Sequence, residues 1–164
     1  GVCMKKHNVA LVLLLCVIAS GAVFAQSKKN SHPVGIGLFL GQPTGIVFEF
    51  DLNATNWVDI TAAWDFTGPT NQNYAFLLFA SYKLAFPGVF VINNTVDLVP
   101  FVGPGLSVGL RPDDVSIGFR IPFGLSWRPS TVPLGIYLEI GLGMQLFPAT
   151  SFQGTGGLGI QYRF

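Results

Sequence analysis

Charged residues are scarce in this chain: they make up 10% of its 164 residues, whereas 50% are hydrophobic. A soluble globular domain usually carries about 25% charged residues, so the composition argues against an ordinary water-soluble domain. Long apolar runs are scarce as well. Only one stretch approaches the ~20 apolar residues of a membrane-spanning helix, and it lies near the front of the chain. A bundle of membrane-spanning helices is therefore excluded.

The apolar run near the front has the features of a secretory signal peptide. Two lysines at 5–6 form a basic start, residues 9–18 are apolar, and small residues lead up to Ala25. We therefore expect residues 1–25 to be cleaved from the exported protein. Within that segment we interpret residues 1–3 as a mis-assigned start or an expression remnant.

Two other interpretations of the front segment stay open, an uncleaved anchor helix and a lipidated Cys16. The small residues at the cleavage position disfavour the first, and the bulky Leu15 disfavours the second. Cleavage would remove both cysteines and two of the nine Lys and Arg residues, which leaves seven basic against eight acidic residues. We then expect no disulfide and no basic patch for nucleic acid. Export without cysteine suits the bacterial envelope.

After a polar lead at 26–33, which we expect to be flexible, the apolar residues recur with a period of two. This period is typical of a strand with one apolar face. It is clearest in three segments near the C-terminus, 115–127, 134–146 and 158–164. In the first of them every odd position is apolar: Val115, Ile117, Phe119, Ile121, Phe123, Leu125 and Trp127. The two longer segments exceed slightly the 9–11 residues with which a tilted strand crosses a bilayer.

Five earlier segments alternate in the same way with more noise: 34–41, 45–52, 57–67, 74–84 and 99–110. Clusters of turn-forming residues separate the segments, the last of them at 148–154. Eight strands satisfy the even number of single-chain bacterial barrels. We predict an all-β fold, an eight-stranded antiparallel transmembrane up-and-down β-barrel over residues 34–164. Residues 85–98 fit either a long loop or a hairpin that prolongs the fourth and fifth strands.

The contents of the two faces indicate which one meets lipid. One face is bulky and apolar, and the other carries glycine, serine and a few charges. A soluble eight-stranded barrel would point its apolar face inward, but small residues fill so narrow a lumen better than bulky ones. Aromatic residues are expected in two girdles at the membrane interfaces. We assign Tyr82, Trp127, Tyr162 and Phe164 to the inner girdle, and Trp64, Phe66 and Tyr74 to the outer one.

The alternating pattern of the chain resembles the small OmpA-like and OmpW-like bacterial outer-membrane barrels. The most specific element is its last segment, which is similar to the C-terminal assembly signal of such proteins: Leu158, Ile160, Tyr162 and Phe164. Residues 99–105 resemble the opening of the fifth strand in these barrels, and the short loops resemble spirochaete members. The resemblance implies residence in the outer membrane, contact with its lipid, and recognition by the outer-membrane assembly machinery.

Two inward-facing groups of charged residues are the candidate site. Arg120 and Glu139 lie at similar depth on neighbouring predicted strands, and an isolated charge in a dry lumen is costly. We therefore predict an Arg120–Glu139 ion pair, with Glu49 as a possible third member. A second group is expected at the periplasmic mouth: Lys83, Arg163, Asp51 and Asp59. The first group is interpreted as a packing plug or, alternatively, as a gate or charge filter.

The residue types of the chain do not favour enzymatic chemistry. His32 is the only histidine after the predicted cleavage site, and no cluster of metal-ligand residues is present, so we expect no catalytic site, metal or cofactor. Two functions remain open. One is a structural or surface-interaction barrel, expected to be monomeric, which presents loops to an extracellular or envelope partner. The other is a narrow, porin-like passive pore, or a conduit for small hydrophobic molecules as the OmpW-like resemblance implies.

Overall fold

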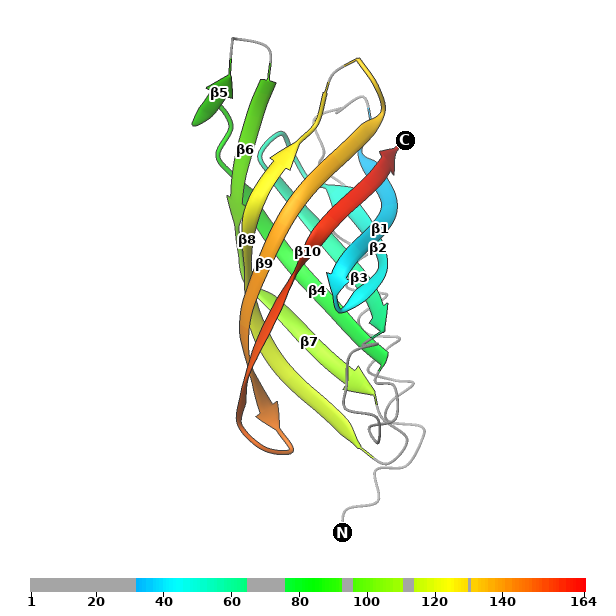
Figure 1. Cartoon of the computed structure of the whole chain (residues 1–164), viewed down its shortest axis with the longest axis vertical. Coiled ribbons are helices and arrows are strands. Elements are labelled where there is room, and N and C mark those ends of the chain that lie inside the picture. Colours follow the sequence, from blue (N-terminus) through cyan, green and yellow to red (C-terminus); the bar gives the residue numbers. More distant parts are fainter. Residues whose placement is uncertain (1–31, 65–75, 93–95, 111–113, 130) are drawn as a thin grey trace.

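Ten strands make up the wall in the computed structural model, which describes residues 32–64, 76–92, 96–110, 114–129 and 131–164. Their bounds are β1 (Val34–Gln42), β2 (Thr44–Asp51), β3 (Asn56–Trp64), β4 (Phe76–Ala85), β5 (Phe90–Ile92), β6 (Val96–Val102), β7 (Gly105–Leu110), β8 (Val115–Trp127), β9 (Leu134–Phe147) and β10 (Ser151–Arg163). We call the end where β1 begins and β10 ends the proximal end, at the top of Figure 1, and the opposite end the distal end.

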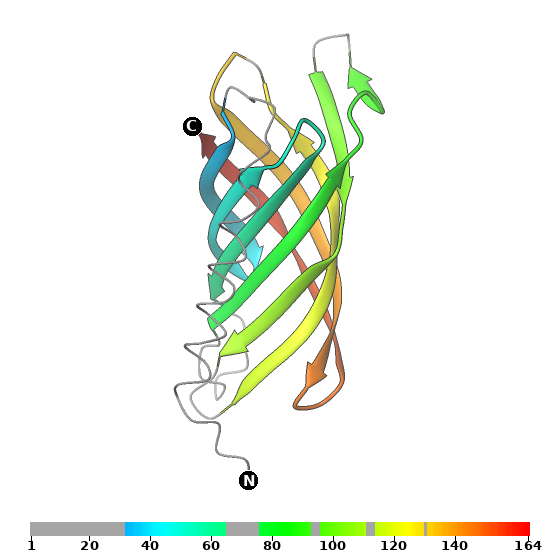
Figure 2. The ribbon, with the colours of Figure 1, turned by 180° about the vertical axis from the view of Figure 1, so that it is seen from behind.

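Strands β6 and β7 together form one strand of the wall. Both pair with β4 on one side and with β8 on the other. They are separated at Gly103 and Pro104, where proline has no N–H to donate, but the Pro104 carbonyl still accepts a hydrogen bond from the Tyr82 N–H at 2.9 Å. The pairing of β3 with β4 closes the sheet. The described chain is therefore an all-β, closed, eight-stranded antiparallel barrel, as predicted (Figures 1 and 2).

The segment 85–98 contains a hairpin. Phe90–Ile92 of β5 pairs with Val96–Leu98 of β6, and the Phe86 N–H donates to the Pro100 carbonyl at 2.9 Å, so the β4–β6 pairing continues one residue past the end of β4. Figure 1 shows β5 and the start of β6 above the other strands. Of the two possibilities that the sequence left open, the hairpin is the one that forms.

The predicted turn at 148–154 is too long. β10 begins at Ser151, which pairs with Gln145 of β9, and the turn shrinks to residues 148–150. The Gln153 amide donates to the Gln145 side chain at 2.9 Å, and this bond across the pair stabilises the strand where a turn was predicted. Gly154 is then a strand residue on the outward face, where a Cβ atom would meet nothing within 4 Å, and it is not required for a turn.

Several sequence-based predictions lie outside the described residues. They include the signal peptide 1–25, Phe66 and Tyr74 of the outer girdle, and the ends of the third and fourth strands beyond Trp64 and before Phe76. The described part contains no helix that is long and apolar enough to cross a membrane.

The faces of the wall are inverted relative to a soluble protein. Large apolar side chains are exposed along the outward positions of the strands, for example Leu106 at 62% and Leu138 at 54%. In contrast, every charged side chain in the described ranges is buried or half-buried. Exposed apolar surface on this scale marks an interface with another apolar phase or partner.

Candidate functional site in the barrel lumen

Glycines make room for the long side chains that fill the lumen. In an antiparallel ladder, register partners lie on the same face of the sheet. Arg120 of β8 has glycine as its register partner on both neighbouring strands, Gly105 and Gly143. Glu139 of β9 likewise lies between Gly124 and Gly157. The glycines of the inward face therefore leave space for a few large polar side chains.

The mid-lumen cluster consists of Asp59, Lys83, Arg120 and Glu139. The Lys83 ammonium forms ion pairs with Asp59 and, at 2.5 Å, with Glu139 Oε2, while Arg120 Nη2 lies 2.6 Å from Glu139 Oε1. Arg120 Nη2 also donates to the Thr155 hydroxyl oxygen at 3.1 Å. Two anions and two cations thus alternate across the barrel, and the cluster is neutral as a whole.

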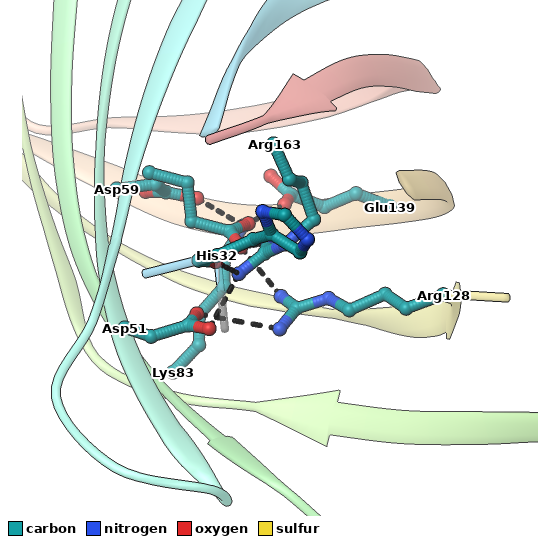
Figure 3. A network of polar contacts seen from close by, with 8 residues as sticks. His32, Asp51, Asp59, Lys83, Arg128, Glu139 and Arg163 are labelled. Carbon is teal, nitrogen blue, oxygen red and sulfur yellow. Dashed lines mark hydrogen bonds and ion pairs between the residues drawn. The ribbon is translucent and has the colours of Figure 1, made fainter. Parts of the chain in front are cut away.

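The rim cluster lies at the proximal end and consists of Glu49, Asp51, Arg128 and Arg163. Glu49 Oε1 accepts hydrogen bonds from Arg128 Nη2 and Arg163 Nη1, both at 2.5 Å. Asp51 pairs with the same two guanidinium groups. Arg163 Nη2 also donates to the His32 carbonyl at 3.0 Å. Figure 3 shows how Asp51, Arg128 and Arg163 converge. This second set also balances two negative and two positive charges.

Aromatic rings pack against the cations of both clusters. Lys83 Nζ lies 4.9 Å from the centroid of the Phe101 ring and 5.2 Å from that of Tyr137. The Arg128 guanidinium carbon lies 4.3 Å from the Trp57 centroid. Phe101 also meets the Trp57 ring edge-on, at 5.6 Å between centroids. These contacts are favourable cation–π and aromatic arrangements, and they occupy space that water would otherwise fill.

The structure contains the predicted ion pair between Arg120 and Glu139. The prediction of Glu49 as its third member is wrong, because Glu49 bonds Arg128 and Arg163 instead. In the wall, Gly35 of β1 is the register partner of both Glu49 on β2 and Arg163 on β10. Glu49 can therefore reach Arg163 across a residue that has no side chain.

The predicted group at the periplasmic mouth divides between the two clusters. Lys83 and Asp59 belong to the mid-lumen cluster, and Arg163 and Asp51 to the rim cluster. These four side chains are also not a solvated mouth, since Lys83 is only 1% exposed and the other three are buried as well. Strand tilt explains the division, because positions that look level in the sequence are staggered along the barrel axis.

Arg128 is the functional residue that the sequence interpretation missed. It follows Trp127 and lies just outside the predicted strand segment 115–127. The signal was nevertheless present. Even positions of the segment 115–127 face inward, and position 128 continues that parity just past the end of β8.

The sequence matches no protein-family model. It also matches no curated protein. Among solved structures, it is similar to Ail, the attachment invasion locus protein of Yersinia pestis. The TM-score is 0.40 and the sequence identity 16%, and the match covers 80% of this chain and 96% of that one.

Buried charges limit what this lumen can do. A water-filled channel would leave the side chains beside it accessible to solvent, yet Glu139 is 5% exposed and Lys83 1%. In the described residues, no group of three or more His, Cys, Asp or Glu side chains is placed to hold a metal ion. The two clusters are neutral and fill the lumen, and their ion pairs connect strands that are distant in sequence.

Proposed function

We propose that the protein is an integral barrel of the bacterial outer membrane that serves as a structural or surface-interaction protein with a filled lumen. The observation that carries the proposal is the distribution of charge, with every described charged side chain buried or half-buried and eight of them paired in the lumen. In water this arrangement would expose a continuous apolar band. In a bilayer, lipid covers that band.

We place the proximal end on the periplasmic side of the membrane, because the strand that ends there, β10, carries the proposed assembly signal. The outward face of β10 then presents the proposed assembly signal to the outer-membrane assembly machinery: Leu158, Ile160, Tyr162 and Phe164. The rings of Tyr162 and Phe164 lie 5.0 Å apart at the proximal end, where an interfacial aromatic girdle is expected. The loops of the distal end face outside and are the surface for an extracellular partner.

A binding or structural role is proposed in preference to catalysis. The described residues include a single histidine, His32, whose side chain is exposed and whose carbonyl accepts a hydrogen bond from Arg163. Acyl transfer or phospholipid cleavage requires a nucleophile beside a positioned base. The acidic groups in the lumen are paired with arginine or lysine side chains instead.

Single-channel recording on the refolded protein in planar bilayers tests the filled lumen. We expect no unitary conductance from the wild type, because the charged side chains of the mid-lumen cluster are buried and paired with one another. Arg120→Ala, which breaks the cluster, is recorded beside Leu138→Ala, whose side chain is on the outward face of the same region. A stable wild-type conductance that changes with Arg120→Ala but not with Leu138→Ala would contradict the proposal and support the narrow pore.

A further inference from the structure

The β5–β6 hairpin lies outside both lumen clusters, so the proposed filled lumen gives it no role. It rises past the proximal rim, and its apolar side chains are exposed, including Phe90 at 54% and Ile92 at 50%. An edge strand of this kind is usually blunted with charge or covered. β5 pairs only with β6 in the described part of the chain.

The hairpin is held in shape by its own contacts. Gly88 has a φ of 79°, in the left-handed region that favours glycine. Its N–H donates to both carboxylate oxygens of Asp97, each at 3.2 Å. This turn lets the chain bulge after Pro87 and then resume pairing with β6 at Phe90. The exposed residues therefore sit on a defined two-stranded element.

The two faces of the β5–β6 hairpin continue opposite faces of the barrel wall. Phe90 and Ile92 have Leu98 and Val96 as their register partners, and Leu98 in turn pairs with Trp127 of β8. These five apolar residues share the outward face and extend the apolar band of the wall without interruption. The opposite face carries Val91 and Asp97, which are partners of each other, and it continues the lumen side.

The height of the hairpin matches the headgroup layer. The Ile92–Val96 pair lies two residues beyond Leu98 and Trp127. At a rise of ~3.3 Å per residue and a tilt of about 40°, that is about 5 Å past the tryptophan. Tryptophan marks the membrane interface, and the polar layer on each side of the hydrocarbon core is about 5–7 Å thick.

We propose that the outward face of the β5–β6 hairpin is a lipid-binding surface that inserts among the headgroups and upper acyl chains of the periplasmic leaflet. The proposal rests on the membrane location given under Proposed function. The partner is phospholipid, because the hairpin face is apolar, uncharged and continuous with the band that lipid covers. The hairpin thereby increases the area of contact between the barrel and the periplasmic leaflet on one side, next to β4, β6 and β8.

Depth-dependent fluorescence quenching tests this surface residue by residue. The full chain carries Cys3→Ser and Cys16→Ser, so that each introduced cysteine is its only thiol. Single cysteines at Phe90, Ile92 and Val91 are labelled with bimane and reconstituted in phosphatidylethanolamine–phosphatidylglycerol vesicles. We expect labels at 90 and 92 to lose intensity to lipids carrying a nitroxide near the headgroup and to resist iodide. The label at 91, on the other face, should lose intensity to iodide.

Leu138→Cys, on the outward face of the barrel, separates the two proposals. If its label is quenched by deep nitroxide lipids while those at 90 and 92 behave like that at 91, the hairpin proposal is overturned and the membrane location stands. If the Leu138→Cys label is not quenched by lipid, the membrane location itself fails. Labels at 90 and 92 that resist both quenchers, and become iodide-accessible when the protein is diluted in lipid, would identify a second copy as the occupant and overturn the proposal.

Discussion

Replacing Glu139 by glutamine should destabilise the barrel more than any other isosteric change in the lumen. Its carboxylate neutralises two buried cations at once, Lys83 at 2.5 Å and Arg120 at 2.6 Å. Lys83 keeps Asp59 as a partner in the variant. Arg120 keeps only neutral contacts among those described, the Thr155 hydroxyl and the Phe79 ring at 4.5 Å.

The magnitude follows from burial. The Arg120 and Glu139 side chains are 7% and 6% exposed, so the variant leaves a desolvated guanidinium without a counter-charge. Removing one partner of such a pair costs about 3–5 kcal/mol, a large part of the ~5–15 kcal/mol that stabilises a typical domain. Replacing both partners together, by Arg120→Met with Glu139→Leu, should recover much of the loss because no unpaired charge remains.

Urea unfolding in lipid vesicles, followed by tryptophan fluorescence, measures the change. Asp114→Asn, the same carboxylate-to-amide change at the start of β8 outside both clusters, is the matched control and should move the free energy of unfolding by less than about 0.5 kcal/mol. A loss of under ~1 kcal/mol for Glu139→Gln, the value of a solvated surface pair, would refute the reasoning. The lumen would then be hydrated at this depth.

Two further predictions concern packing inside the barrel and contact with lipid outside it. Gly159→Ala would place a Cβ 2.0 Å from the Tyr137 ring, whereas a Cβ at Gly154 of the same strand meets nothing within 4 Å. The refolding yield in detergent should therefore fall sharply for Gly159→Ala and stay unchanged for Gly154→Ala. Equal yields for the two variants would show that the Tyr137 ring has room to move. Ile140→Arg, midway along the outward face of β9, should lower the free energy of unfolding in vesicles by ~2–4 kcal/mol, and Leu134→Arg at the strand's proximal end by ~0–1 kcal/mol. Equal costs at the two positions would contradict a bilayer around the strand.

Local pattern was enough to predict the wall and one ion pair. The alternation in 115–127 and 134–146 assigns inward and outward faces directly, because a strand has a side-chain period of two. Arg120 and Glu139 lie only 19 residues apart on consecutive strands. A short connection limits their register, and the pair could therefore be inferred.

The remaining contacts depend on how the barrel closes. Lys83 and Glu139 are 56 residues apart, and Glu49 and Arg128 are 79 apart. Such pairs join strands that are not consecutive, and the stagger between them is set by closure of the whole sheet. Turn-forming residues explain the two other errors, the missed Arg128 and the turn predicted at 148–154. Pro129 and Pro133 concealed the inward parity of Arg128, and the glycines after Ser151 concealed the start of β10.

The electrophoretic mobility of the protein extracted from an outer-membrane fraction tests the central claim most directly. A closed barrel whose strands are cross-linked through its lumen should resist SDS without heating, and it should shift to its unfolded position only after boiling. The account predicts this heat-dependent shift for protein recovered from the outer membrane. Protein absent from that fraction, or protein that migrates identically before and after boiling, would contradict it.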